Sequence, residues 1–90
     1  MEHFPAPDVL KIDVEGAEGD VLRGASKVLL EVRPLIYCEV AEKSCEAVTD
    51  LFRQFRYRMW DGASFDGRFV NELIRAANNT VAFPEEKVPN

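Results

Sequence analysis

A regular alternation of strand-like and helix-like segments along a chain of 90 residues limits its possible folds more than any other feature. Four short segments, at 8–14, 35–40, 57–60 and 79–84, have the strand-like patterns, and the second is a nearly continuous apolar run. Helix-like segments with apolar residues at steps of three and four lie between them. Strands that alternate with helices are typical of βαβ units and a parallel sheet.

The helical patterns have recognisable ends. The first pattern covers 17–29, and the pair Arg33-Pro34 is expected to end this region because a residue before proline avoids helical backbone. Ser44 is expected to cap a second helix over 45–55 with its side chain. A third apolar stripe over 70–77 predicts another helix.

These elements predict an α/β fold of three layers, with the order β-α-β-α-β-α-β along the chain. The sheet should have about four strands and be mostly parallel, with the last two strands antiparallel. A chain of this length suffices for one domain. We place that domain at 8–84, between a flexible lead-in over 1–7 and a polar tail over 85–90.

The charge of the chain excludes several classes of partner. The net charge is −5 and the isoelectric point about 4.8, which argues against nucleic acid and anionic membrane surfaces as partners. No apolar run approaches the ~18 residues of a membrane span, and no secretory signal is visible. Cys38 and Cys45 have neither a redox nor a zinc-site spacing. A cytoplasmic location is therefore expected.

The segment 11–18, KIDVEGAE, concentrates carboxylates at a strand-to-helix junction. Asp13 falls at the carboxyl end of its strand, where open α/β sheets bind ligands. It is either a residue of such a site or a structural carboxylate bonded to backbone amides. Glu15 lines the same cleft or stabilises the start of the following helix, where negative charge is favourable.

Three further residues are candidates for a binding site. Glu39 lies near the carboxyl end of the second strand, so in a parallel sheet it should approach Asp13. Such a pair can attract a divalent cation, but the ligand pattern is incomplete and no metal site is predicted. Trp60 and Phe65 flank the loop 61–67 and either supply apolar walls of a pocket or, for Trp60, complete the core.

The stretch DVLKIDVEGAEGDVLRGA at 8–25 resembles the signature of FkbM-type S-adenosylmethionine-dependent methyltransferases. The similarity extends to Arg33-Pro34 before a strand ending in Glu-Val, to Tyr57, and to the closing N-x-V-A-F-P of 79–84, so it covers 8–84. The resemblance implies a partial Rossmann-like methyltransferase fold. In that fold the sheet order is 3-2-1-4-5-7-6, and 8–14 corresponds to strand 4.

The resemblance also implies a reaction and roles for the candidate residues. The reaction would be methyl transfer to a hydroxyl group, with S-adenosylmethionine as cofactor. Asp13 and Glu15 would orient the acceptor, and Glu39, Trp60 and Phe65 would contact it. In that family this region is the C-terminal half. No G-x-G turn follows a strand here, so the chain alone is expected to bind no cofactor and to be inactive.

The implied missing half leaves strand 8–14 as an exposed sheet edge, which is an aggregation hazard unless another strand covers it. We expect either a homo-oligomer, most simply a dimer, built on strand 8–14, or pairing with a separate N-terminal half. Two other functions are open at this point. One is a non-enzymatic assembly module that uses strand 8–14, and the other is a small acidic binder of divalent metals or ligands through Asp13, Glu15 and Glu39.

Overall fold

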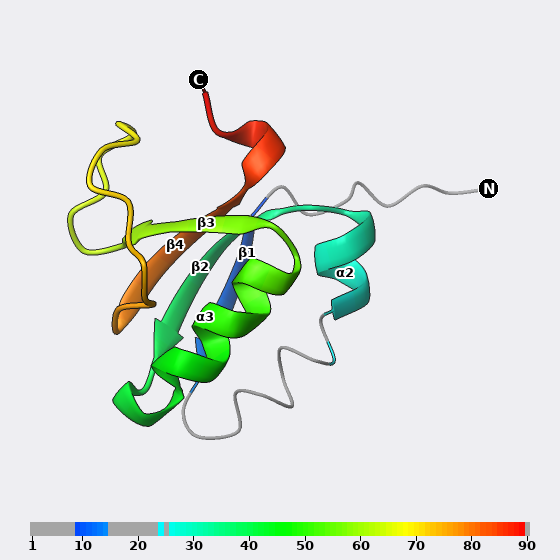
Figure 1. The fold of residues 1–90 in the computed structure, drawn as a ribbon, viewed down its shortest axis with the longest axis horizontal. Coiled ribbons are helices and arrows are strands. Elements are labelled where there is room, and N and C mark those ends of the chain that lie inside the picture. Colours follow the sequence, from blue (N-terminus) through cyan, green and yellow to red (C-terminus); the bar gives the residue numbers. More distant parts are fainter. Residues whose placement is uncertain (1–8, 15–23, 25, 90) are drawn as a thin grey trace.

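The structure, a computed structural model, describes residues 9–14, 24 and 26–89 (Figure 1). Within these ranges one sheet of four strands is formed by β1 (Val9–Val14), β2 (Leu35–Val40), β3 (Tyr57–Asp61) and β4 (Asn79–Pro84). The helices are α2 (Ser26–Glu31) and α3 (Cys45–Gln54), with short 3-10 turns η1 (Glu42–Ser44) and η2 (Glu85–Lys87). The predicted α/β class with a sheet of four strands is confirmed.

The sheet has the order β1-β2-β4-β3. β1 pairs with β2 in parallel, whereas β4 is antiparallel to both β2 and β3. Three strands therefore point in one direction and β4 alone is reversed. The last two strands are antiparallel as predicted, but of the three strand pairs in the described sheet only β1–β2 is parallel, so the sheet is mixed and not mostly parallel. The order is also the 4-5-7-6 arrangement that the resemblance implies.

Helix α3 is amphipathic, as its apolar spacing predicts. Val48 and Phe52 are fully buried, and the partly buried Leu51 and Phe55 pack against the same core. Ser44 lies at the N-cap position, but its side chain makes no capping hydrogen bond, so the expected side-chain cap is wrong. The turn η1 precedes the helix instead, and its backbone provides the hydrogen bond from Ser44 N–H to the carbonyl of residue 41 (2.9 Å).

The end of α2 follows the sequence prediction. The helix stops at Glu31, and Arg33 adopts a left-handed backbone conformation with φ 57° immediately before Pro34. Such a conformation ends helices because it turns the chain out of the helical path. Of the first predicted helix, 17–29, the part before Ser26 lies largely outside the described residues.

The predicted third helix over 70–77 is wrong. This segment has no helix in the structure, and Ile74 is 81% exposed. Its backbone is bonded to neighbouring elements: Leu73 N–H donates to the carbonyl of Met59 (2.8 Å), and Ala76 N–H donates to Thr49 Oγ1 (2.8 Å). Because β4 lies antiparallel beside β3, no crossover helix is needed between them. Tertiary hydrogen bonds therefore override the helical periodicity.

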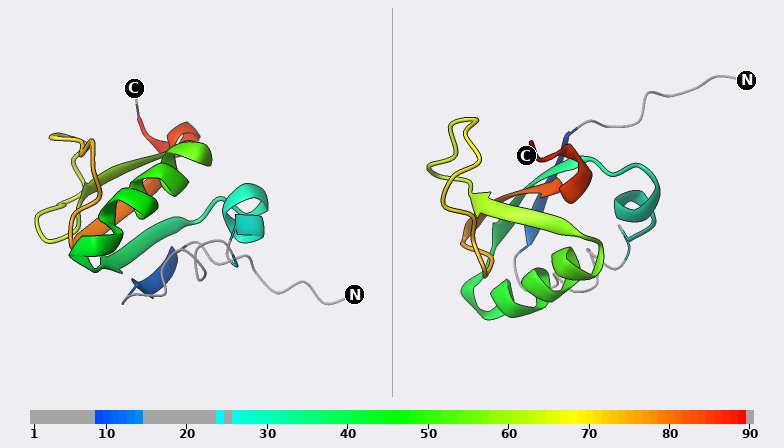
Figure 2. Two further views of the ribbon diagram at one scale, coloured as in Figure 1. Left: turned by 60° about the horizontal axis from the view of Figure 1, so that its bottom comes forward. Right: turned by 45° about the horizontal axis from the view of Figure 1, so that its top comes forward.

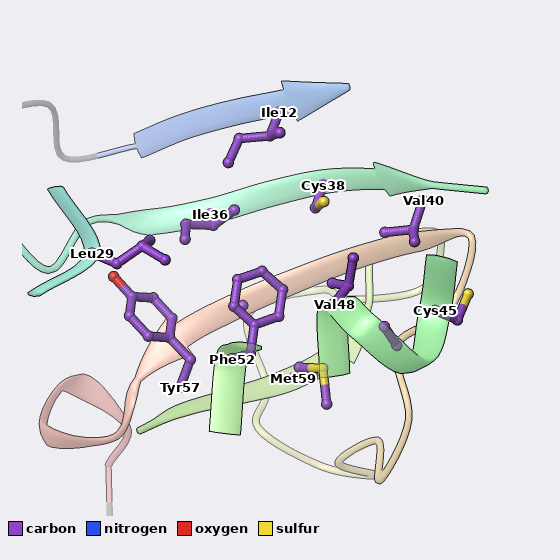
Figure 3. Packing of buried hydrophobic residues seen from close by; sticks show 12 residues of the cluster. Ile12, Leu29, Ile36, Cys38, Val40, Cys45, Val48, Phe52, Tyr57 and Met59 are labelled. Carbon is purple, nitrogen blue, oxygen red and sulfur yellow. The ribbon is translucent and has the colours of Figure 1, made fainter. Parts of the chain in front are cut away.

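The two faces of the sheet are covered differently. One face packs against α2 and α3, which contribute Leu29, Val48 and Phe52 to a core shared with Ile36 and Cys38 of β2 (Figure 3). On the other face, the described residues form a smaller core from β3, β4, the segment after β3 and the C-terminal turn. Its members are Trp60, Val81 and Val88, with Phe65, Phe69 and Phe83 packed around them.

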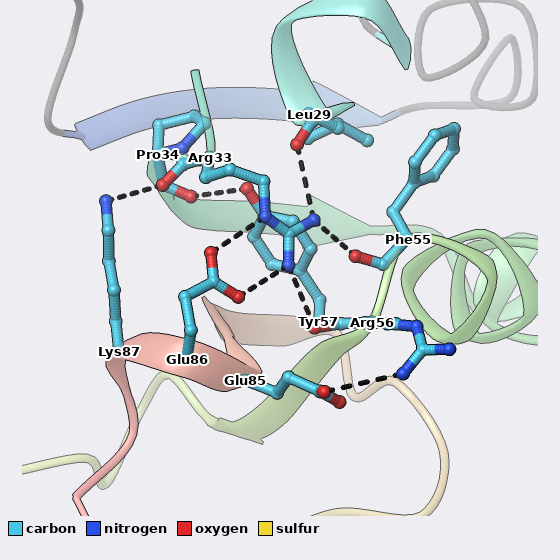
Figure 4. A network of polar contacts seen from close by, with 9 residues as sticks. All are labelled: Leu29, Arg33, Pro34, Phe55, Arg56, Tyr57, Glu85, Glu86 and Lys87. Carbon is cyan, nitrogen blue, oxygen red and sulfur yellow. Dashed lines mark hydrogen bonds and ion pairs between the residues drawn. The ribbon is translucent and has the colours of Figure 1, made fainter. Parts of the chain in front are cut away.

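The C-terminal turn is held by Arg33 (Figure 4). The guanidinium forms two hydrogen bonds to Glu86, from Nε to Oε2 (2.9 Å) and from Nη2 to Oε1 (2.8 Å). It also lies 4.9 Å from the ring centroid of Tyr57 and donates to the carbonyl of Phe55. Lys87 Nζ completes the arrangement by donating to the carbonyl of Arg33 (2.6 Å). One cation thus joins the end of α2, the end of α3 and η2.

This packing shifts the pKa values of Glu86 and Tyr57. The hydrogen bonds from Arg33 lower the pKa of the Glu86 carboxyl to about 2. Burial raises the pKa of Tyr57 to about 12. The Tyr57 hydroxyl donates to the carbonyl of Pro34 (2.7 Å), so its protonated form is also the one that fits the structure.

Candidate functional site

Polar residues gather at the edge of the sheet where β1 and β2 end. The register places Asp13 of β1 beside Glu39 of β2, and Glu39 beside Asn79 of the reversed strand β4. Neighbouring strands lie about 4.8 Å apart, so these three backbone positions form a continuous row. The expected approach of Asp13 and Glu39 is confirmed for the backbone. Asn79 is a member of this row that the sequence interpretation did not assign to the site.

The row lies on a definite face of the sheet. Ile36, Cys38 and Val40 point into the core beneath the helices, and strand alternation therefore directs Glu39 to the opposite face. Glu39 is exposed there. Glu15, the second predicted catalytic residue, lies outside the described residues.

Gly62, in the turn after β3, packs against Asn79 at one end of this row. Its N–H donates to the carbonyl of Asn79 (2.8 Å). A Cβ at this position would lie 3.1 Å from Cε2 of Tyr37 and 3.2 Å from the carbonyl carbon of Asn79. Glycine suits this close approach, because a Cβ would require these neighbours to move by a few tenths of an ångström. The space beside Gly62 is therefore filled by the protein itself.

A cavity of about 340 Å³ lies beyond β3 and is lined partly by Trp60 and Phe65. Both views in Figure 2 show the segment after β3, yellow to orange, at that end of the sheet. The other lining residues are mostly polar and include Asp61, Ser64, Asp66, Arg68 and Asn71. Trp60 and Phe65, the two aromatic residues predicted to flank a pocket, both line this cavity.

Trp60 is also a core residue. Its side chain is 2% exposed, and its ring centroid lies 6.3 Å from that of Phe65 and 4.9 Å from that of Phe69, nearly edge-on to the latter. The alternative that Trp60 completes the core is therefore confirmed. Its indole N–H is buried and has no hydrogen-bond acceptor among the described residues. A buried donor of this kind is costly, at about 1–3 kcal/mol.

One ion pair lines the cavity, and a second lies beside Trp60 but outside the lining. Arg68 Nη2 lies 2.6 Å from Asp66 Oδ2, and this hydrogen bond holds the pKa of that carboxyl below its usual value. Arg58 pairs with Glu72 at 2.5 Å, and its guanidinium lies 5.5 Å from the ring centroid of Trp60. The cavity is thus lined by an anionic and a cationic side chain, Asp66 and Arg68, together with the aromatic rings of Trp60 and Phe65.

The described residues do not contain the parts of a nucleoside-binding cradle. β2 is followed by Ala41 and η1 without a glycine, and the one glycine directly after β3, Gly62, is packed against protein atoms. Within the same residues, no group of three His, Cys, Asp or Glu side chains is arranged to hold a metal ion.

The geometry defines part of an α/β methyltransferase-like sheet with polar residues at its carboxyl edge. The family model of the FkbM methyltransferase domain matches residues 1–59, which is well over half of the chain. The chain therefore belongs to the FkbM methyltransferase family, and the suspected resemblance is confirmed. No curated protein and no solved structure matches it significantly. Among the described residues, no helix is long and apolar enough to cross a membrane.

Proposed function

We propose that this chain forms the acceptor side of an FkbM-type O-methyltransferase and does not methylate anything alone. The observation that carries the proposal is the row Asp13, Glu39 and Asn79 at the carboxyl edge of the sheet, in a chain of this family. Open α/β sheets bind their ligands outside this edge. The substrate would carry a hydroxyl group.

The chemistry of the row suits a hydroxyl acceptor. A carboxylate accepts the hydrogen bond of an O–H group and so fixes the direction of the remaining lone pairs on that oxygen. Asp13 and Glu15 would hold the hydroxyl in this way. Glu39 and the side chain of Asn79 would bind neighbouring polar groups of the acceptor, while Trp60 and Phe65 would form the apolar side of its pocket.

S-adenosylmethionine supplies the methyl group in this family, but the described residues do not fit it. Neither β2 nor β3, whose following residues are described, is followed by a glycine-rich turn and a helix, which is the arrangement that open α/β folds use for nucleosides. We therefore derive no step through the cofactor from these residues, and the cofactor side of the cleft is assigned to a segment beyond them.

Calorimetry tests the cofactor part of the proposal. S-adenosylmethionine titrated into the purified chain should give no saturable heat, whereas a complete methyltransferase measured in parallel should bind it. Saturable binding to this chain alone would contradict the assignment of the cofactor side to another segment. The acceptor part is tested separately.

The acceptor part can be followed by fluorescence because Trp60 is the single tryptophan of the chain. Polyhydroxylated compounds, titrated as a panel, should change its emission, and Glu39→Gln should weaken the binding of any compound that does. The matched control is Glu46→Gln, at an exposed position of α3, which should leave binding unchanged. Equal binding by the two variants would remove Glu39 from the acceptor site.

A further inference from the structure

A second cavity, of about 290 Å³, lies at the beginning of β3. Its lining combines the end of α3, the first residues of β3, the segment after β3 and the turn η2. β3 runs in the same direction as β1 and β2, so its first residues lie at the amino edge of the sheet. Tyr57 and Asp61 are the two ends of this strand, about 13 Å apart along it. The cavity is therefore at the opposite edge from the row of Asp13, Glu39 and Asn79.

This cavity is positively charged on an acidic chain. Three arginines line it, Arg53, Arg56 and Arg58, together with two carboxylates, Glu72 and Glu85. The lining thus has an excess of positive charge, although the whole chain carries a net charge of −5. A local concentration of cations of this kind attracts anions.

The guanidinium of Arg56 has unused hydrogen-bonding capacity. Its Nη1 lies 3.7 Å from Glu85 Oε1, which is beyond hydrogen-bond distance, and the side chain is 78% exposed (Figure 4). In the described part of the chain it makes no other side-chain contact of this kind. Each guanidinium carries five N–H donors, so those of Arg56 are available to a ligand.

The other two arginines are held in place by the protein. Arg58 donates from Nε (3.0 Å) and Nη2 (2.5 Å) to the same oxygen of Glu72. Arg53 donates from Nη2 to the carbonyl of Ile74 (2.5 Å) and keeps its remaining donors. Cations that are already positioned lose less entropy when a ligand binds. The cavity therefore has two fixed cations and one that can close on an anion.

The backbone of Arg56 adds a second indication. This residue follows the C-cap of α3 with φ 59°, a left-handed conformation that glycine usually provides at the end of a helix. Its carbonyl accepts the N–H of Glu85 (2.9 Å), which holds this conformation. A long cationic side chain at a position that favours glycine suggests a role other than forming the turn, since such conformations cluster at functional sites.

The end of α3 does not oppose an anion strongly. Helix C-termini carry partial negative charge because their last carbonyls lack partners. Here the carbonyls of Leu51 and Arg53 accept the N–H groups of Phe55 and Arg56, both at 3.1 Å. The carbonyl of Phe55 accepts a hydrogen bond from Arg33. These bonds reduce the negative charge that the helix end presents to the cavity.

We propose that this cavity binds the phosphate group of a small organic phosphate monoester, at a site separate from the acceptor site. Arg53 and Arg56 donate to the phosphate oxygens, and Arg58 adds positive charge. A phosphate monoester has three acceptor oxygens and a charge of about −1.5 to −2, which suits guanidiniums that come from different elements better than the two oxygens of a carboxylate. Ile74, which is 81% exposed and lines the cavity, contacts the organic group.

Nuclear magnetic resonance on the full ¹⁵N-labelled chain tests the site, with phenyl phosphate as the probe. The side-chain Nε–H signals of Arg53 and Arg56 should shift and saturate, with a dissociation constant of about 1 mM. Benzoate, which has the same ring and a carboxylate, should bind at least threefold more weakly. Inorganic phosphate should also bind more weakly, because it makes no apolar contact with Ile74. Sodium chloride at equal ionic strength should give no saturable shift.

Variants of Arg56 separate binding from folding. Arg56→Gln should weaken the binding of phenyl phosphate by about tenfold, since it removes a charge-assisted contact. Arg56→Gly should weaken binding as much, yet raise the melting temperature by a few degrees because glycine relieves the left-handed conformation. The matched control is Arg75→Gln, an exposed arginine that pairs with Glu42 outside this cavity. This control should bind phenyl phosphate like the wild type.

Four results would overturn the proposal. The first is the absence of a saturable shift at Arg53 and Arg56. The second is equal affinity for benzoate, which would remove the preference for phosphate. The third is wild-type binding by folded Arg56→Gln and Arg56→Gly chains. The last is a set of shifts confined to Arg68, which would place the anion in the cavity beside Trp60 instead.

Discussion

Arg33 shows how much a single side chain contributes to this small domain. Its five donors serve Glu86 and several backbone carbonyls at once, including those of Leu29 and Arg56. Carbonyls at the ends of helices lack partners within the helix, and a guanidinium can satisfy them together. The residue therefore links elements that are far apart in the sequence.

The pair between Arg33 and Glu86 should make stability depend on pH in the acid range. The pKa of Glu86 is lowered from 4.5 to about 2 in the folded chain. Its contribution is therefore fully present above pH 4.5 and is lost as the pH falls toward 2. Glu86→Gln should reduce this dependence and, because the pair is exposed, cost about 0.2–1 kcal/mol of unfolding free energy at pH 7. Urea unfolding at several pH values measures both effects, with Glu46→Gln as control.

Tyr57 should produce the opposite behaviour at alkaline pH. Burial raises its pKa from 10.0 to about 12 in the folded chain. The stability that follows from this shift is present below pH 10 and is lost as the pH rises toward 12. Absorbance titration at the phenolate band should show one tyrosine ionising near pH 12, and Tyr57→Phe should remove that step. A Tyr57→Phe chain that keeps this step would contradict the burial of Tyr57.

Among the elements, the segment after β3 departs furthest from its sequence pattern. Its apolar residues have helical spacing, yet Leu73 bridges to β3 and Ala76 is bonded to α3. The strands 35–40, 57–60 and 79–84 were predictable because each is short, apolar and bounded by turn residues. The backbone path of 70–77 could not be predicted in this way. The hydrogen bonds that fix it are accepted by Met59 and Thr49, which are distant in sequence.

Thr49 provides a test of this path. Its hydroxyl donates to the carbonyl of Cys45 (2.6 Å) and accepts the N–H of Ala76 (2.8 Å). Thr49→Val should therefore leave the buried N–H of Ala76 without an acceptor and cost about 1–3 kcal/mol. Ile74→Ala, at an exposed position, should stay within about 0.5 kcal/mol of the wild type. Urea unfolding measures both costs. A larger loss of unfolding free energy for Ile74→Ala than for Thr49→Val would favour a helix over 70–77.

For the whole molecule, the sequence allowed the α/β class, the strand order and the meeting of Asp13 with Glu39 to be predicted. The class follows from the pattern of elements, and the meeting of the two carboxylates from their positions at strand ends. The strand order follows from the resemblance to the FkbM family. The role of the charged C-terminal segment was not predictable from composition, because Glu85, Glu86 and Lys87 have the pattern of a solvated tail. Asn79 was missed as a site residue because its approach to Glu39 depends on the reversal of β4.

The C-terminal segment should matter to global stability. Val88 is buried in the small core with Trp60, and Glu86 is bound by Arg33. Truncation after Pro84 should lower the melting temperature by several degrees and shift the emission of Trp60 to longer wavelength. Glu85→Gln keeps Val88 and should change neither. A truncated chain with wild-type melting and emission would show that the second core does not need this segment.

The position of β4 has a consequence for how the chain is made. β4 is the last of the four strands to be synthesised, yet it lies inside the sheet, between β2 and β3. While residues 79–84 are still within the ribosome, β2 and β3 have no strand to join them. The sheet can therefore close only after β4 has emerged, and its long-range pairings should slow its folding. Nascent chains arrested before residue 79 should accordingly remain sensitive to protease.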